Sequence, residues 1–128
     1  MDRDTLKAAD VDILIVDDSS RMRAMIRALL APLGARVHEC TDGDEAVARY
    51  DELSPDWVLM DVAMRRLDGI AATRQIRSAH ADARVLIVTE HADPALQIAA
   101  AEAGAAGYVL KENLFEILDH LEPLSPAR

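Results

Sequence analysis

Short apolar runs rich in β-branched residues alternate with helical patterns along most of this chain. The first run, Ile13-Leu14-Ile15-Val16, is uninterrupted by polar residues, which is typical of a strand buried on both faces. Further runs of strand character occupy residues 36–40, 57–60, 85–88 and 107–110. Strands that alternate with helices form parallel sheets covered by helices on both sides. The pattern therefore predicts a doubly wound α/β domain.

Five helices are predicted between and after these strands. In the first, apolar residues recur at helical spacing and predict a core-facing stripe; they are Met22, Met25, Ile26, Leu29, Leu30 and Leu33, followed by Gly34. The other helices are expected at residues 45–53, after an Asp42-Gly43 turn, and at 70–77, 94–103 and 114–121. We find no internal repeat or linker. One domain of ordinary size accounts for the 128 residues.

Composition excludes several classes of protein. The formal net charge of −9 argues against a nucleic-acid surface, which requires a basic face. The single cysteine, Cys40, cannot form an internal disulfide and suits a small core residue in a reducing compartment. The acidic N-terminus is unlike a signal peptide, and no apolar run approaches the ~20 residues of a membrane helix. We expect a cytoplasmic domain with no nucleic-acid or membrane partner.

Four of the predicted strands end in polar residues. Asp17 and Asp18 follow the first strand, Asp61 the third, Thr89 the fourth and Lys111 the fifth. In an open parallel sheet the ligand site lies beyond the carboxyl ends of the strands, so these residues should converge on one crevice. Strand two contributes nothing comparable. This fits a flanking position for strand two and the sheet order 2-1-3-4-5.

The chemistry of this set points to phosphoryl transfer. Three carboxylates at close range repel one another unless a cation lies among them, and oxygen ligands without His or Cys favour Mg²⁺. A lysine and a hydroxyl on the same rim suit the oxygens of a phosphoryl group. Because a carboxylate can act as the nucleophile, the set predicts Mg²⁺-assisted formation of an acyl phosphate on one aspartate.

The segments ILIVDDSSRMR, VLMDVAMRRLDG, VLIVTEHAD and GYVLKENL resemble the receiver domain of two-component response regulators. The resemblance covers nearly the whole chain, and GYVLKEN is similar to receivers that carry helix-turn-helix outputs. It implies the flavodoxin-like fold, with a receiver domain at residues 11–122, an N-terminal extension at 1–10 and a C-terminal tail at 123–128. It also implies a phosphoacceptor signalling switch, which catalyses only its own phosphorylation and dephosphorylation.

The resemblance assigns Asp61 as the phosphoacceptor and Mg²⁺ as its cofactor. Asp18 would be a direct metal ligand, and Asp17 would act on the metal largely through water. Asp61 and the backbone carbonyl of Ala63 would complete the protein's share of the metal shell. No organic cofactor is implied.

Three further residues carry roles in the family pattern. Lys111 would pair with the phosphoryl oxygens, Thr89 would move toward the phosphoryl group, and Tyr108 would follow as the switch aromatic. The phosphodonor would be a histidine kinase or a phosphotransfer protein. A downstream protein effector would read the face formed by the fourth helix, the fifth strand and the fifth helix. The chain would be a monomer or a phosphorylation-dependent homodimer.

Three positions depart from the usual family pattern. Arg65 stands where proline is common, Glu90 stands where a small residue is usual, and Glu112 replaces a proline that often follows the lysine. None of these changes removes a reacting group, so we expect phosphorylation with altered kinetics. The alternative is a phosphorylation-independent interaction or dimerisation module, which Arg65 and Glu90 alone favour.

Ordinary structural roles are the competing interpretations for single residues. Asp17 and Asp18 precede a helix, where acids commonly cap the N-terminus. Lys111 could be a solvated surface lysine. Arg65 and Arg66 suit a solvated loop pair. Ala63 argues against an aspartyl-phosphate phosphatase, which needs a second acid two residues after the nucleophile. A flavin site is disfavoured because the two carboxylates after strand one would repel the flavin phosphate.

Overall fold

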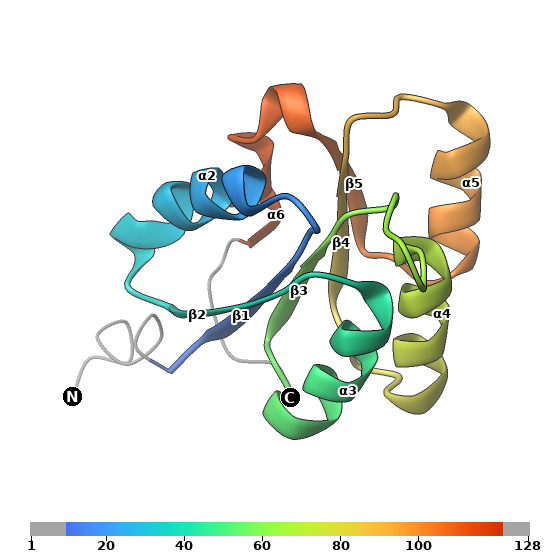
Figure 1. The fold of residues 1–128 in the computed structure, drawn as a ribbon, viewed down its shortest axis with the longest axis horizontal. Coiled ribbons are helices and arrows are strands. Elements are labelled where there is room, and N and C mark those ends of the chain that lie inside the picture. Colours follow the sequence, from blue (N-terminus) through green and yellow to red (C-terminus); the bar gives the residue numbers. More distant parts are fainter. Residues whose placement is uncertain (1–9, 122–128) are drawn as a thin grey trace.

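The computed structural model describes residues 10–121 and forms one five-stranded parallel sheet (Figure 1). The strands are β1 (Asp12–Val16), β2 (Arg36–Cys40), β3 (Trp57–Met60), β4 (Val85–Thr89) and β5 (Gly107–Leu110). They are arranged in the order β2-β1-β3-β4-β5, and every neighbouring pair is parallel. Both the doubly wound fold and the strand order predicted from the sequence are confirmed.

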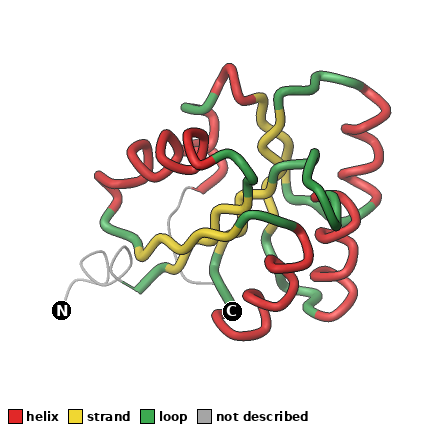
Figure 2. Tube along the Cα trace, viewed as in Figure 1, coloured by secondary structure: helices red, strands yellow, loops and turns green. Residues whose placement is uncertain are grey.

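Helices cover both faces of the sheet (Figures 1 and 2). The α-helices are α2 (Ser20–Leu30), α3 (Gly43–Leu53), α4 (Gly69–Ala79), α5 (Pro94–Glu102) and α6 (Glu116–Leu121). Two short 3-10 helices, η1 (Ala31–Leu33) and η2 (Lys111–Asn113), follow α2 and β5. Helices α2 and α6 pack on one face, and α3, α4 and α5 pack on the other. The five predicted helices are therefore all present.

Side chains of the central strands point alternately to the two faces of the sheet and form two hydrophobic cores, one on each face. Ile13 and Ile15 of β1 pack with α2 and α6, whereas Leu14 and Val16 pack with the three helices on the opposite face. Successive side chains of a strand point to opposite faces, so a strand covered on both sides must be apolar throughout. This explains why β1, β3 and β4 are almost wholly buried while the edge strand β2 is not.

Side-chain caps fix where the helices begin. Ser19, Asp42, Asp68 and Asp93 are the N-caps of α2, α3, α4 and α5, and each accepts a hydrogen bond from a backbone N–H in the first turn. The prediction of a separate Asp42-Gly43 turn was wrong. Gly43 is already the first residue of α3, because the Asp42 carboxylate caps the helix by accepting the N–H of Asp44, one of the groups that a helix start leaves unpaired.

The predicted apolar stripe of the first helix is only partly buried. Ile26 and Leu30 lie in the core, but Met25 keeps 47% of its surface exposed, so its assignment to the core was wrong. Met25 lies at the edge of the stripe, beside Phe115, which is 78% exposed. These side chains border an apolar groove between α2 and α6 of about 590 Å³, lined by Met25, Ala28, Leu29, Pro32, Leu114, Phe115 and Leu118. We call it the α2–α6 groove.

Two sequence expectations fall outside this structure. The predicted N-terminal extension, except for residue 10, and the predicted C-terminal tail lie beyond the described residues. Among the described helices, none is both long and apolar enough to span a bilayer.

Candidate functional site

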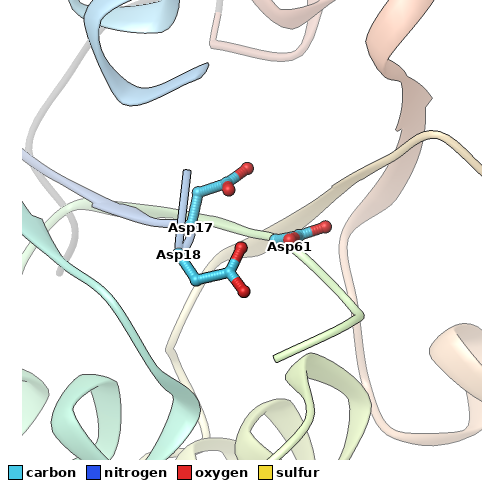
Figure 3. Close-up of side chains that lie close together, drawn as sticks. All are labelled: Asp17, Asp18 and Asp61. Atoms are coloured by element: carbon cyan, nitrogen blue, oxygen red, sulfur yellow. The ribbon is translucent and has the colours of Figure 1, made fainter. Parts of the chain in front are cut away.

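Three carboxylates meet at the carboxyl ends of two neighbouring strands. Asp17 and Asp18 follow β1, and Asp61 follows β3. Each offers an oxygen, and these oxygens lie within 4.8 Å of one another. Figure 3 shows the three side chains close together. Asp17 and Asp61 are buried, whereas Asp18 is exposed. The predicted convergence of these acids is therefore present in the structure.

Lys111 reaches the same cluster from the end of β5. Its Nζ lies 2.9 Å from Oδ2 of Asp17 and 3.2 Å from Oδ1 of Asp61. The side chain is only 13% exposed, so Lys111 is not the solvated surface lysine considered from the sequence. One ammonium group thus faces two buried carboxylates and offsets part of their repulsion.

The environment of the cluster changes the proton affinity of its members. Burial raises the pKa of Asp61, and the charge of Asp17 raises it further; Lys111 and the N–H of Val62 act in the opposite direction. Burial alone would lower the pKa of Lys111, but its close contact with the Asp17 carboxylate and the charge of Asp61 outweigh burial and raise it. Lys111 therefore stays charged, while Asp61 binds a proton more readily than a solvated aspartate does.

The donor set fits Mg²⁺. All three candidate ligands are carboxylates, with no His or Cys among them, and hard oxygen ligands suit this ion. Oδ2 of Asp17 is buried and, among the described residues, lies near Lys111 without making a hydrogen bond of good geometry. Buried polar oxygens are normally satisfied, so this atom has capacity for a further ligand. Oδ1 is occupied by the N–H of Ser19 at 2.9 Å.

The loop after β3, residues 61–68, is fixed at its beginning. The N–H of Asp61 donates to the carbonyl of Val16, and the N–H of Val62 donates to Oδ1 of Asp61, both at 2.9 Å. The carbonyl of Val62 in turn accepts from Gly69 at 2.9 Å. A side chain at Gly69 would collide with the carbonyl oxygen of Asp61, so close approach requires glycine here.

Ala63, the expected source of a metal-binding carbonyl, lies two residues after Asp61 in this loop and is exposed. Within the part of the chain that the structure describes, its carbonyl oxygen accepts no hydrogen bond. This leaves the oxygen free for another partner.

Thr89 and Tyr108 converge on the backbone of one residue. Thr89 is fully buried, and its Oγ1 accepts a hydrogen bond of 3.3 Å from the N–H of His91. The hydroxyl of Tyr108 donates to the carbonyl of His91 at 2.6 Å. Both predicted switch residues therefore hold the loop between β4 and α5. Burial, and secondarily the charge of Asp93, raises the pKa of Tyr108, so its hydroxyl remains a donor at neutral pH.

Asp42, which follows β2, was missed from the sequence. It is 3% exposed, and its two oxygens accept from the N–H groups of Arg66 and Leu67 at 2.9 and 3.0 Å. These bonds lower the pKa of Asp42 far below its usual range, outweighing the opposing effect of burial. A signal was present: Asp42 and Glu45 have the spacing of a capping box, and Glu45 bonds back to Thr41. The end of strand two therefore does contribute, by holding the β3–α4 loop.

The arginine pair of this loop is not simply solvated. Arg66 is exposed, as expected of a solvated loop residue, and it also binds both oxygens of Asp44, at 2.7 and 3.1 Å. Arg65 is exposed and makes no ion pair with any residue in the described ranges. Glu90 and Glu112, the other two departures, are exposed as well.

Comparisons with known proteins agree on one family. The family model for the response regulator receiver domain matches residues 13–122. The chain is 40% identical over 100 residues to the chemotaxis protein CheY of Bacillus subtilis (strain 168), covering 77% of this chain and 83% of that protein. It is 36% identical over 118 residues to the transcriptional regulatory protein LiaR of the same strain, covering 90% of this chain and 56% of LiaR.

Solved structures give the same result. A LuxR-family two-component response regulator from Aurantimonas sp. SI85-9A1 superposes with a TM-score of 0.81 at 40% identity, covering 88% of this chain and 82% of that one. The CheX-CheY-BeF3-Mg complex of Borrelia burgdorferi matches with a TM-score of 0.82 at 25% identity, covering 88% and 87%. This chain belongs to the response regulator receiver domain family, whose members act in two-component signalling with histidine kinases and downstream effectors.

Proposed function

We propose that Asp61 accepts a phosphoryl group from a phosphohistidine, on a histidine kinase or a phosphotransfer protein. The observation that carries this proposal is the contact of Lys111 with two acids of a three-carboxylate cluster at the end of the sheet. A surface lysine in an ordinary salt bridge would not be drawn into a buried acid cluster from a strand two positions away.

The reaction is an in-line displacement at phosphorus. Oδ1 of Asp61 already accepts the N–H of Val62 and faces Lys111, so Oδ2 is the oxygen that attacks. The new bond joins Oδ2 to phosphorus, the P–N bond to the donor histidine breaks, and its electron pair returns to the imidazole ring. Lys111 neutralises charge on the phosphoryl oxygens. Water later hydrolyses the acyl phosphate and restores the carboxylate with release of phosphate.

Asp17, Asp18, Asp61 and the carbonyl of Ala63 would hold Mg²⁺. When bound, the ion supplies positive charge that offsets the acids and the incoming phosphoryl group. The chain's own contribution is to place these oxygens on the rigid ends of β1 and β3. We assign residues 11–122 to this domain.

Thr89 and Tyr108 would transmit the phosphorylation state. Both hold the backbone of His91, so movement of the Thr89 hydroxyl toward a phosphoryl group would release one of the two bonds on this loop. The surface read by an effector would be the face of α5, β5 and α6. Ile98 of α5 is 59% exposed, which gives this face an apolar contact point.

Arg65, Glu90 and Glu112 would modify the rate without removing a reacting group. Glu90 directly follows Thr89 and is exposed, so it adds a negative charge next to a residue of the proposed site. We expect it to slow the approach of anionic phosphodonors, and Arg65 to act in the opposite sense.

Phosphorylation by a small-molecule phosphodonor tests the proposal. Incubation with acetyl phosphate and Mg²⁺ should add one phosphoryl group to the wild type, measured by intact mass, and none to Asp61→Asn. Omission of Mg²⁺ should abolish the reaction. Equal labelling of Asp61→Asn, or no labelling of the wild type, would refute it.

The α2–α6 groove favours a second candidate, a phosphorylation-independent dimer of this chain. Arg21 lies four residues before Met25 and Asp119 four residues after Phe115, so a two-fold dimer over this groove would offer each Arg21 an acidic partner. Neither charge has an ion-pair partner among the described residues. Sedimentation equilibrium should then show a dimer without Mg²⁺ or phosphodonor that Phe115→Glu dissociates. A wild-type monomer at all accessible concentrations contradicts this candidate.

A further inference from the structure

The β3–α4 loop is anchored from a helix that carries no residue of the proposed phosphoryl-transfer site. Its first two residues are tied to β1 and to Gly69. Its later part is tied to the start of α3, through Asp42 and Gly43. Ala63, Met64 and Arg65 lie between these two anchors, and no hydrogen bond from the described residues fixes their backbone.

Asp42 supplies the larger part of the second anchor. Oδ1 accepts from the N–H of Arg66 at 2.9 Å, and Oδ2 accepts from the N–H of Leu67 at 3.0 Å. Gly43 adds a backbone bond of 3.2 Å to the carbonyl of Leu67, and a side chain at Gly43 would collide with that oxygen. One buried carboxylate therefore fixes two successive peptide groups of the loop.

This anchor adjoins the part of the loop whose backbone makes no hydrogen bond with the described residues. Arg65 leaves its own φ free, and its N–H has no partner within the described part of the chain. Met64 packs against the core, but three residues whose backbone makes no hydrogen bond with the described residues could still adopt several conformations, and each would place the Ala63 carbonyl differently. The two bonds to Asp42 shorten the free segment to residues 63–65 and thereby limit where that carbonyl can lie.

We infer that Asp42 is a positioning residue for the cation site: by holding the N–H groups of Arg66 and Leu67, it sets the place of the Ala63 carbonyl relative to the Asp61 carboxylate. This inference rests on the proposed function, because it takes the Ala63 carbonyl as a ligand. Removal of a group that orients a metal ligand by hydrogen bonding typically weakens metal binding by about 10- to 100-fold. Asp42 differs from such a group in acting on the backbone of the loop rather than on a ligand side chain.

Two variants of Asp42 separate positioning from loss of charge. Asp42→Ala removes both acceptors, whereas Asp42→Asn keeps one carbonyl oxygen and can hold one of the two loop N–H groups. Asp56→Ala is a matched control. Asp56 is also a buried aspartate, 7% exposed, and its carboxylate accepts a backbone N–H, but from Asp12 at the opposite end of the sheet. Asp44→Ala is the second control, because it releases the Arg66 side chain and leaves the loop backbone bonds in place.

The measurement is the dissociation constant of Mg²⁺ alone, by isothermal titration calorimetry, with thermal unfolding of each metal-free variant alongside. We expect Asp42→Ala to weaken Mg²⁺ binding about ten-fold, within the range for groups that orient ligands, and Asp42→Asn to weaken it less. Asp56→Ala and Asp44→Ala should bind Mg²⁺ within about two-fold of the wild type, even where they lower Tm as much. The inference is overturned if Asp42→Ala binds as the wild type does, or if Asp56→Ala weakens binding equally. A wild type that binds no Mg²⁺ overturns the proposed metal site itself, and the inference with it.

Discussion

The ammonium group of Lys111 lies 3.2 Å from Oδ1 of Asp61, although β4 separates the strands that these two residues follow. Lys111 therefore reaches across the carboxyl end of β4. This contact links the carboxylate at the end of β3 to the lysine that follows β5. It makes the proton affinity of Asp61 depend on a residue from the edge strand of the sheet.

Replacement of Lys111 should raise the pKa of Asp61. Lys111 lowers this pKa both by its charge and by its hydrogen bond, so Lys111→Met leaves burial and the Asp17 charge unopposed. Carbon-detected NMR titration of the Asp61 carboxyl group in metal-free protein measures the change. Lys111→Arg keeps the charge and should shift the pKa less. An unchanged titration in Lys111→Met would contradict the assigned contact.

Asp61→Asn should stabilise the metal-free domain at neutral pH. Because burial and the Asp17 charge raise the pKa of Asp61, the folded chain keeps this proton to higher pH than the unfolded chain does. The ionised carboxylate therefore lowers stability as pH rises above the ordinary carboxyl pKa of 3.8. Asn carries no charge, so Tm at pH 7 should rise by on the order of a few °C.

Measuring the Tm of Asp61→Asn and the wild type at several pH values provides a control. The advantage of Asp61→Asn should shrink as pH falls through the raised pKa, and it should be absent where Asp61 is protonated in both states. Asp82→Asn, at an exposed position, serves as the matched variant. A gain that persists unchanged at acid pH would show that the charge of Asp61 is not its cause.

Gly69→Ala should disrupt the site and the fold together. Its Cβ would occupy the position of the Asp61 carbonyl oxygen, so β3 and the start of α4 must separate. Such overpacking costs about 3 kcal/mol. Urea unfolding measures the loss. Stability equal to that of the wild type would mean that the close approach of Gly69 to Asp61 is not maintained in solution.

Tyr108→Phe should loosen the loop between β4 and α5. The variant loses only the hydroxyl that donates to the carbonyl of His91 at 2.6 Å. A single hydrogen bond contributes about 1 kcal/mol, so amide exchange in residues 90–93 should accelerate about five-fold. Tyr50→Phe is the control, because the Tyr50 hydroxyl makes no hydrogen bond with any described residue. Equal exchange in both variants contradicts the role given to Tyr108.

The sheet could be predicted from the sequence because its signal is local. The run 57–60 matches β3 residue for residue, since a strand covered on both faces tolerates no polar side chain. The run 107–110 likewise matches the edge strand β5, which is only partly buried. The convergence of Asp17, Asp61 and Lys111 followed from the same pattern. Parallel strands all end at one edge, so their last residues meet whatever their distance in the chain.

The loop contacts of Asp42 and the exposure of Met25 could not be predicted from the sequence. The partners of Asp42 are backbone N–H groups 24 and 25 residues away. Nearly every residue type has a backbone N–H, so the sequence does not indicate which residues will donate to Asp42. Met25 has the right helical spacing for the core. In the structure it lines the α2–α6 groove and remains 47% exposed. Both cases depend on how separate elements pack, which periodicity alone does not encode.

The most direct test of the central claim locates the phosphoryl group. After reaction with acetyl phosphate and Mg²⁺, borohydride reduction converts an aspartyl phosphate to homoserine, which peptide mass spectrometry assigns to a position. We expect homoserine at position 61 alone, and none when Mg²⁺ is omitted. Homoserine at Asp17, Asp18 or any other aspartate, or at none, would contradict the claim.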